Sequence, residues 1–88
     1  MIFNIDELKK KIIYRSTYRG TKEMDALISS FTKQIINDLN GDELINLSNL
    51  LDIDDENLYK FNQGLSPSVD IEKNKVSKLF KEFKYNKE

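Results

Sequence analysis

The chain has 88 residues, neither cysteine nor histidine, and 14 basic against 15 acidic residues, which give a formal charge of −1. This length suits one domain with a modest core. Without cysteine or histidine the chain can form no disulfide, lacks the usual ligands of zinc, haem and iron–sulfur clusters, and lacks the commonest general base. We therefore expect a protein that is not an enzyme and holds no metal.

The near-neutral charge creates no global positive field, so we expect no binding to nucleic acid or to anionic lipid. The longest basic run, Lys9-Lys10-Lys11, is interpreted as the solvated face of a helix. No apolar stretch reaches the roughly 18 residues that span a bilayer, and Asp6 and Glu7 interrupt the N-terminus before a signal peptide could develop. These features predict a soluble, cytoplasmic protein that does not insert into membranes.

The first predicted helix has apolar residues spaced three and four apart, at Ile5, Leu8 and Ile12. Asn4 followed by Glu7 resembles a capping box at its start. We expect this helix to end near Tyr18, because Gly20 can adopt the positive φ that closes a helix.

The second predicted helix has the strongest apolar pattern, and each of its buried side chains should contribute roughly 1.5–3 kcal/mol to the core. Its apolar face consists of Met24, Leu27, Ile28, Phe31 and Ile35, with Leu39 as an extension. The sequence then turns at Asn40-Gly41-Asp42, where Asn40 and Glu43 form a second capping pair. A short third helix follows, with an apolar face of Leu44, Leu47, Leu50 and Leu51.

The acidic residues 52–56 lack the spacing and the glycine of a calcium-binding loop, so we interpret them as the N-terminus of a fourth helix. Leu58 and Phe61 anchor that helix, and Gly64 ends it. After a connector at residues 65–68, a fifth helix is expected with the apolar residues Val76, Leu79, Phe80 and Phe83, followed by a frayed tail at about 84–88. The prediction is an all-α, compact five-helix antiparallel bundle that forms a single domain over residues 1–88.

Three features are candidates for function. The first is a group of charged residues around Gly20, namely Arg15, Arg19, Lys22, Glu23 and Asp25. These are either solvated charges beside a helix stop, or a surface that a partner approaches closely because glycine has no Cβ, with arginine and glutamate binding the partner. The second is Tyr59 with Phe61, one of which is exposed as an interface anchor unless both fill the core. The third is Tyr14 with Tyr18, which either border a binding surface or cover the bundle.

Two segments together resemble the signature of the succinate dehydrogenase FAD-assembly factors, the flavinator family. Residues 14–16 (YRS), 19–25 (RGTKEMD) and Phe31 are similar to the family's Arg-Gly-x-x-Glu motif and the apolar helix that follows it. Residues 50–61 resemble its leucine pair, acidic turn and aromatic helix. The resemblance covers residues 8–64, with two departures: Tyr18 replaces a second arginine common in bacterial members, and Tyr59 and Phe61 replace common tryptophans.

The resemblance implies a five-helix chaperone, monomeric when free, that binds the flavoprotein subunit of succinate dehydrogenase and, for some members, of fumarate reductase. It implies that the protein promotes covalent attachment of FAD to this partner without stably binding the cofactor. The implied partner-binding residues are Arg19, Gly20, Glu23 and Asp25, and we add Arg15 and Tyr18 beside them.

Other functions are open on the residues alone. A helix-turn-helix protein is disfavoured because residues 44–51 contain no lysine or arginine. A direct FAD carrier is disfavoured because no dinucleotide-binding fingerprint is present. A generic helical adaptor or antitoxin-like module with a different partner is the main alternative.

Overall fold

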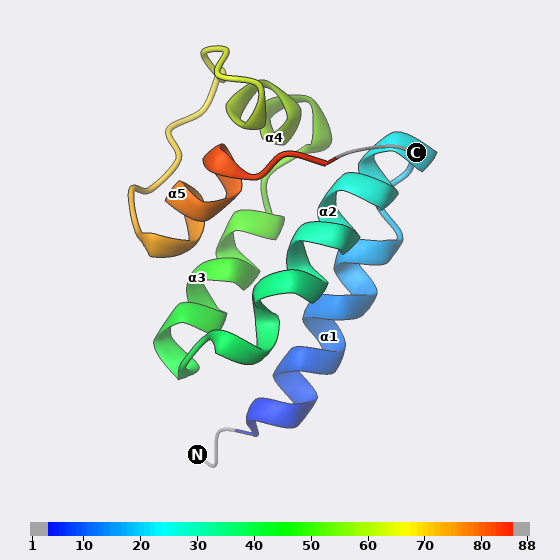
Figure 1. Ribbon diagram of the computed structural model, residues 1–88, viewed down its shortest axis with the longest axis vertical. Coiled ribbons are helices and arrows are strands. Elements are labelled where there is room, and N and C mark those ends of the chain that lie inside the picture. The colour runs from blue at the N-terminus through cyan, green and yellow to red at the C-terminus, as the bar shows by residue number, and fades with distance from the viewer. Residues whose placement is uncertain (1–3, 86–88) are drawn as a thin grey trace.

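The computed structural model describes residues 4–85 and consists of five α-helices and one 3₁₀ turn in that range (Figure 1). The elements are α1 (Ile5–Thr17), α2 (Lys22–Ile35), η1 (Ile36–Asp38), α3 (Gly41–Leu51), α4 (Asp55–Asn62) and α5 (Lys75–Glu82). The predicted all-α class and the five helices are confirmed.

The first three helices lie side by side and alternate in direction, while α5 packs against α3 (Figure 1). Helix α4 lies beyond the end of α3, toward the same end of the molecule as the loop between α1 and α2. Residues 83–85, which follow α5, run from α5 toward α2 (Figure 1). The two candidate sequence motifs, around residue 20 and around residue 55, are therefore brought to one end of the fold.

Each α-helix begins at a polar residue whose side chain accepts a hydrogen bond from a backbone N–H of the first turn. These N-cap residues are Asn4, Thr21, Asn40, Asp54 and Asn74. The capping box of Asn40 and Glu43 is reciprocal, as the sequence predicted, with distances of 2.9 and 3.0 Å. The helix boundaries are thus set largely by local side-chain chemistry.

One hydrophobic core receives side chains from all five helices, and the predicted apolar faces of α2 and α3 are buried in it. Phe31 of α2 and Phe80 of α5 are fully buried, with ring centroids 5.0 Å apart. Leu39 also reaches this core, but it does so beyond η1, because α2 ends at Ile35.

The last part of the chain differs from the sequence prediction. Residues 63–74 form a connector, so α5 starts at Lys75 and not directly after Ser68. The backbone N–H of Ser68 donates to the buried Asn57 side chain at 2.7 Å, which holds the connector against α4. Phe83 follows α5 in an extended conformation and packs on Phe31 at 5.4 Å between ring centroids. Lys84 and Tyr85 lie outside any helix, and residues 86–88 of the expected frayed tail lie outside the described residues.

Within residues 4–85, no helix is long and apolar enough to cross a membrane.

Candidate docking surface

The loop between α1 and α2 is held by the first turn of α2. Gly20 has a φ of +132°, a conformation that L side chains rarely adopt, which explains glycine here. The Asp25 carboxylate accepts hydrogen bonds from the backbone N–H of Arg19 and, at 3.3 Å, from that of Gly20. Thr21 caps α2 by accepting from the N–H of Met24 at 3.1 Å. The loop therefore has a defined shape, and Asp25 is occupied in maintaining it.

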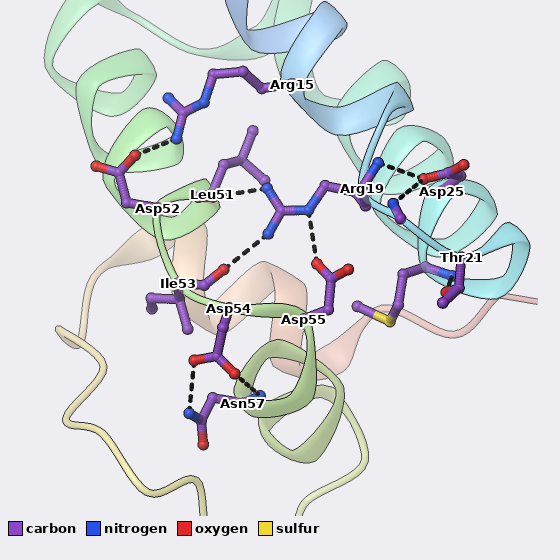
Figure 2. Close-up of polar contacts among 12 residues, drawn as sticks. Arg15, Arg19, Thr21, Asp25, Leu51, Asp52, Ile53, Asp54, Asp55 and Asn57 are labelled. Atoms are coloured by element: carbon purple, nitrogen blue, oxygen red, sulfur yellow. Dashed lines mark hydrogen bonds and ion pairs between the residues drawn. The ribbon is translucent and has the colours of Figure 1, made fainter.

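The side chain of Arg19 turns into the molecule and joins this loop to the loop between α3 and α4 (Figure 2). Its Nε donates to Asp55 at 2.9 Å, and its two terminal nitrogens donate to the carbonyl oxygens of Leu51 at 2.7 Å and Ile53 at 2.8 Å. Leu51 is the last residue of α3, where carbonyl groups lack helical partners and a cation is favoured by the helix dipole. Arg19 thus caps α3 and pairs with the first turn of α4.

Another arginine, which lies on α1, also pairs with an aspartate that follows α3. Arg15 donates to Ser48 at 3.0 Å. It also forms an ion pair with Asp52 (Figure 2). We refer to Arg15, Arg19, Asp52 and Asp55 as the arginine clamp. Because its donors bind within the chain, the Arg19 guanidinium is not the free fork that the sequence suggested for carboxylate or phosphate groups of a partner. Its role, and that of Arg15, in partner binding stays a prediction.

The acidic run at residues 52–56 is explained by this arrangement. The run was predicted to form the N-terminus of a helix, and within it Asp54 is the N-cap of α4. Asp54 accepts from the Asn57 backbone at 3.3 Å and from the Asn57 side chain at 2.8 Å (Figure 2). The hydrogen bond from the Asn57 side chain is the largest cause of a lowered pKa at Asp54. Asp52 pairs with Arg15 of α1, and Asp55 pairs with Arg19 of the α1–α2 loop. The sequence did not predict these two contacts, because they join residues 37 and 36 positions apart, respectively.

Exposure shows which of the aromatic residues lie in the core. Tyr14 and Tyr18 are exposed and pack on each other, with ring centroids 4.7 Å apart, so they do not cover the core, and their place beside a binding surface stays a prediction. Tyr59 is exposed on α4, while Phe61 is half-buried and stacks on Phe80. Tyr59 is therefore the aromatic of this pair that a partner can reach.

Glu23 is exposed in the first turn of α2 and lies at the edge of a groove of about 420 Å³. The groove is lined by Glu23, Met24, Leu27, Tyr59, Asn62, Gln63, Lys84 and Tyr85. The buried side chain of Asn62 donates to the carbonyl oxygens of Phe80 at 2.9 Å and Phe83 at 3.0 Å, which anchors the C-terminal segment beside the groove. The sequence did not predict this groove, because its C-terminal wall depends on where the chain goes after α5.

The comparisons with known proteins agree with these motifs. The family model described as flavinator of succinate dehydrogenase matches residues 10–84. The mitochondrial succinate dehydrogenase assembly factor 2 of Debaryomyces hansenii is 35% identical over 89 residues, covering 97% of this chain and 63% of that protein. That of Saccharomyces cerevisiae is 34% identical over 88 residues, covering 96% of this chain and 54% of the relative. The chain therefore spans between about half and two thirds of the relatives' length. No solved structure is a significant match.

The relatives correct one prediction and confirm another. Both are named as mitochondrial proteins, which contradicts the expectation of a cytoplasmic protein. That expectation used the lack of an apolar signal, yet mitochondrial transit peptides are amphipathic and leave no such mark. The resemblance drawn from the two sequence motifs is confirmed, because the family match covers both. The chain belongs to the family of succinate dehydrogenase flavinators.

Proposed function

We propose that this protein is an assembly factor that binds the flavoprotein subunit of succinate dehydrogenase and promotes covalent attachment of FAD to it. The observation that carries the proposal is the family match over residues 10–84, which includes the ordered α1–α2 loop and the arginine clamp. The same match disfavours the alternative of a generic adaptor or antitoxin-like module. The flavoprotein subunit of fumarate reductase, a client that the resemblance implies for some members of the family, is a second candidate.

The role we propose is not catalytic. Membership of an assembly-factor family supports this, and the sequence offers neither histidine nor cysteine as a nucleophile or base. FAD is then a substrate of the partner and is not held stably by this chain. Binding would fix the flavoprotein in a geometry in which its flavin and its acceptor side chain are aligned, and such orientation alone lowers barriers by several kcal/mol, up to about 7–11.

The docking surface we propose divides the predicted residues into two groups. Glu23 and Tyr18 are exposed, and Gly20 exposes backbone that a partner can approach. Arg19 and Asp25 instead bind groups within the chain, and these contacts fix the orientation of the backbone at Gly20. The signature would thus combine contact residues with residues that position them.

The test is the covalent flavin content of the flavoprotein subunit, measured by in-gel flavin fluorescence after incubation with FAD, with and without this protein. We expect covalent flavin to rise several-fold with the wild-type protein, and to fall toward the background with Glu23→Ala. Glu82→Ala, which removes an exposed carboxylate from the end of α5, is the matched control and should act like the wild type. Equal flavin content with and without the protein would contradict the proposal.

A further inference from the structure

We infer that the groove beside Glu23 accepts an extended segment of the flavoprotein subunit in which an apolar side chain stands next to a basic one. The inference rests on the proposed function and identifies the part of the partner that this surface recognises. It follows from three features of the groove: an apolar floor, a carboxylate at its edge, and two aromatic walls.

The floor of the groove is apolar. Met24 and Leu27, on the first two turns of α2, line it and are otherwise buried in the core. A volume of about 420 Å³ is within the roughly 300–1,000 Å³ of ligand sites, so the groove accommodates side chains and not merely water. Met24 and Leu27 are each 7% exposed, so most of the apolar area removed from water would be that of the incoming side chain itself, and the gain is proportional to that area.

The lining of the groove carries one carboxylate, that of Glu23, and one ammonium group, that of Lys84. Glu23 lies in the first turn of α2 and, among residues 4–85, forms neither a salt bridge nor a side-chain hydrogen bond. A carboxylate in this position is left for a donor from outside, and a lysine or arginine satisfies it best. Lys84, on the C-terminal segment, supplies a donor for a backbone carbonyl of the same bound segment.

The walls of the groove are tyrosines held by a rigid frame. Tyr59 of α4 is 50% exposed and Tyr85 of the C-terminal segment is 41% exposed. The segment that carries Tyr85 is fixed by the two hydrogen bonds from Asn62 and by the packing of Phe83 on Phe31. Tyrosine is enriched among the residues that dominate binding energy, and a groove already formed loses little freedom when its partner binds.

The first experiment measures the affinity of this protein for the isolated flavoprotein subunit by calorimetry. Tyr59→Ala and Tyr85→Ala should each weaken binding about tenfold or more, as expected for aromatic anchors. Leu65→Ala is the control, because Leu65 is 57% exposed and lies on the connector, outside the groove. All three side chains are exposed, so unchanged thermal unfolding is expected and confirms that the variants are folded.

The second experiment tests the chemistry of the occupant. Affinity for the wild-type protein should fall as salt is raised, since an ion pair at Glu23 is screened, and Glu23→Gln should show a flatter salt dependence. Glu82→Gln should keep the wild-type slope. A photo-cross-linking phenylalanine analogue in place of Tyr85 should join to one peptide of the flavoprotein that contains adjacent apolar and basic residues, whereas the same analogue in place of Leu65 should not.

The outcomes separate this inference from the proposed function. If the wild-type protein neither binds the flavoprotein nor raises its covalent flavin, the proposed function is wrong. If the wild-type protein does both, but the tyrosine variants bind as tightly as Leu65→Ala, the groove is not the binding site. A cross-linked peptide that lacks a basic residue would overturn the inferred occupant while leaving the groove as the site.

Discussion

Replacing Asp55 by asparagine removes one charge from the arginine clamp and leaves the shape of the side chain almost unchanged. The Arg19 side chain is 11% exposed and would keep its two carbonyl acceptors, but it would lose its counter-charge. Removing one partner of a fully buried ion pair costs about 3–5 kcal/mol. Because Asp55 itself is 28% exposed, water replaces part of the lost interaction, and we expect a loss of about 1–3 kcal/mol.

The second ion pair of the clamp is a matched control. Arg15 and Asp52 are 34% and 67% exposed, so Asp52→Asn should reduce the free energy of unfolding by at most about 1 kcal/mol. Urea unfolding followed by far-ultraviolet circular dichroism measures both losses. The loss for Asp52→Asn should shrink further in high salt, while that for Asp55→Asn should persist. Equal losses for the two variants, within about 0.5 kcal/mol, would refute the argument from burial.

Three further perturbations have defined outcomes. Gly20→Ala should lower the free energy of unfolding by about 1–3 kcal/mol, because the φ of +132° strains any side chain; a neutral effect in urea unfolding would contradict this. Asn62→Ala should cost about 1–3 kcal/mol, because the carbonyl oxygen of Phe83 loses its side-chain donor and that of Phe80 keeps only the backbone N–H of Phe83; tryptic cleavage near Lys84 should become faster, and unchanged proteolysis would count against the anchor. The hydrogen bond from the Asn40 backbone, and after it the contact with Lys75, lower the pKa of Glu43 from its ordinary value of 4.5. Ionised Glu43 therefore stabilises the fold fully at pH values above its pKa in the unfolded chain, and this stabilisation is lost as the pH falls through its pKa in the folded protein. Acid unfolding of Glu43→Gln should therefore show a weaker pH dependence below about pH 5 than the wild type, and identical curves would argue against this role.

The features that the sequence predicted are those determined by neighbouring residues. The apolar face of α2 and the capping box at Asn40 depend on spacings of three and four positions, and both are present in the structure. The start of α5 also depends on neighbouring residues, but the sequence analysis placed it too early. Asn74 caps α5 through a reciprocal hydrogen-bond pair with Ser77, whereas the prediction considered only the apolar spacing later in the helix.

The roles of the candidate residues in partner binding stay a prediction, and the sequence did not show where their side chains lie. Sequence motifs identified Arg19, Glu23 and Asp25 together, yet only the three-dimensional structure separates Glu23, which is exposed, from Arg19, which is turned inward. The direction of an arginine side chain depends on acceptors far along the chain, here the carbonyl oxygens of Leu51 and Ile53. A single sequence carries no record of such pairings.

The hydrogen bonds that Asp25 accepts within the α1–α2 loop have a consequence for the motions of the molecule. Amide protons in a loop between helices normally exchange with solvent early, because such loops open locally at little cost in free energy. Here the amides of Arg19 and Gly20 are bound to a carboxylate of α2, while the Arg19 side chain is fastened to the end of α3. In hydrogen–deuterium exchange, the amide of Arg19 should therefore exchange as slowly as amides within the helices, and more slowly than amides in the connector at residues 63–74. The turn that carries the family signature would then be among the last parts of this chain to open.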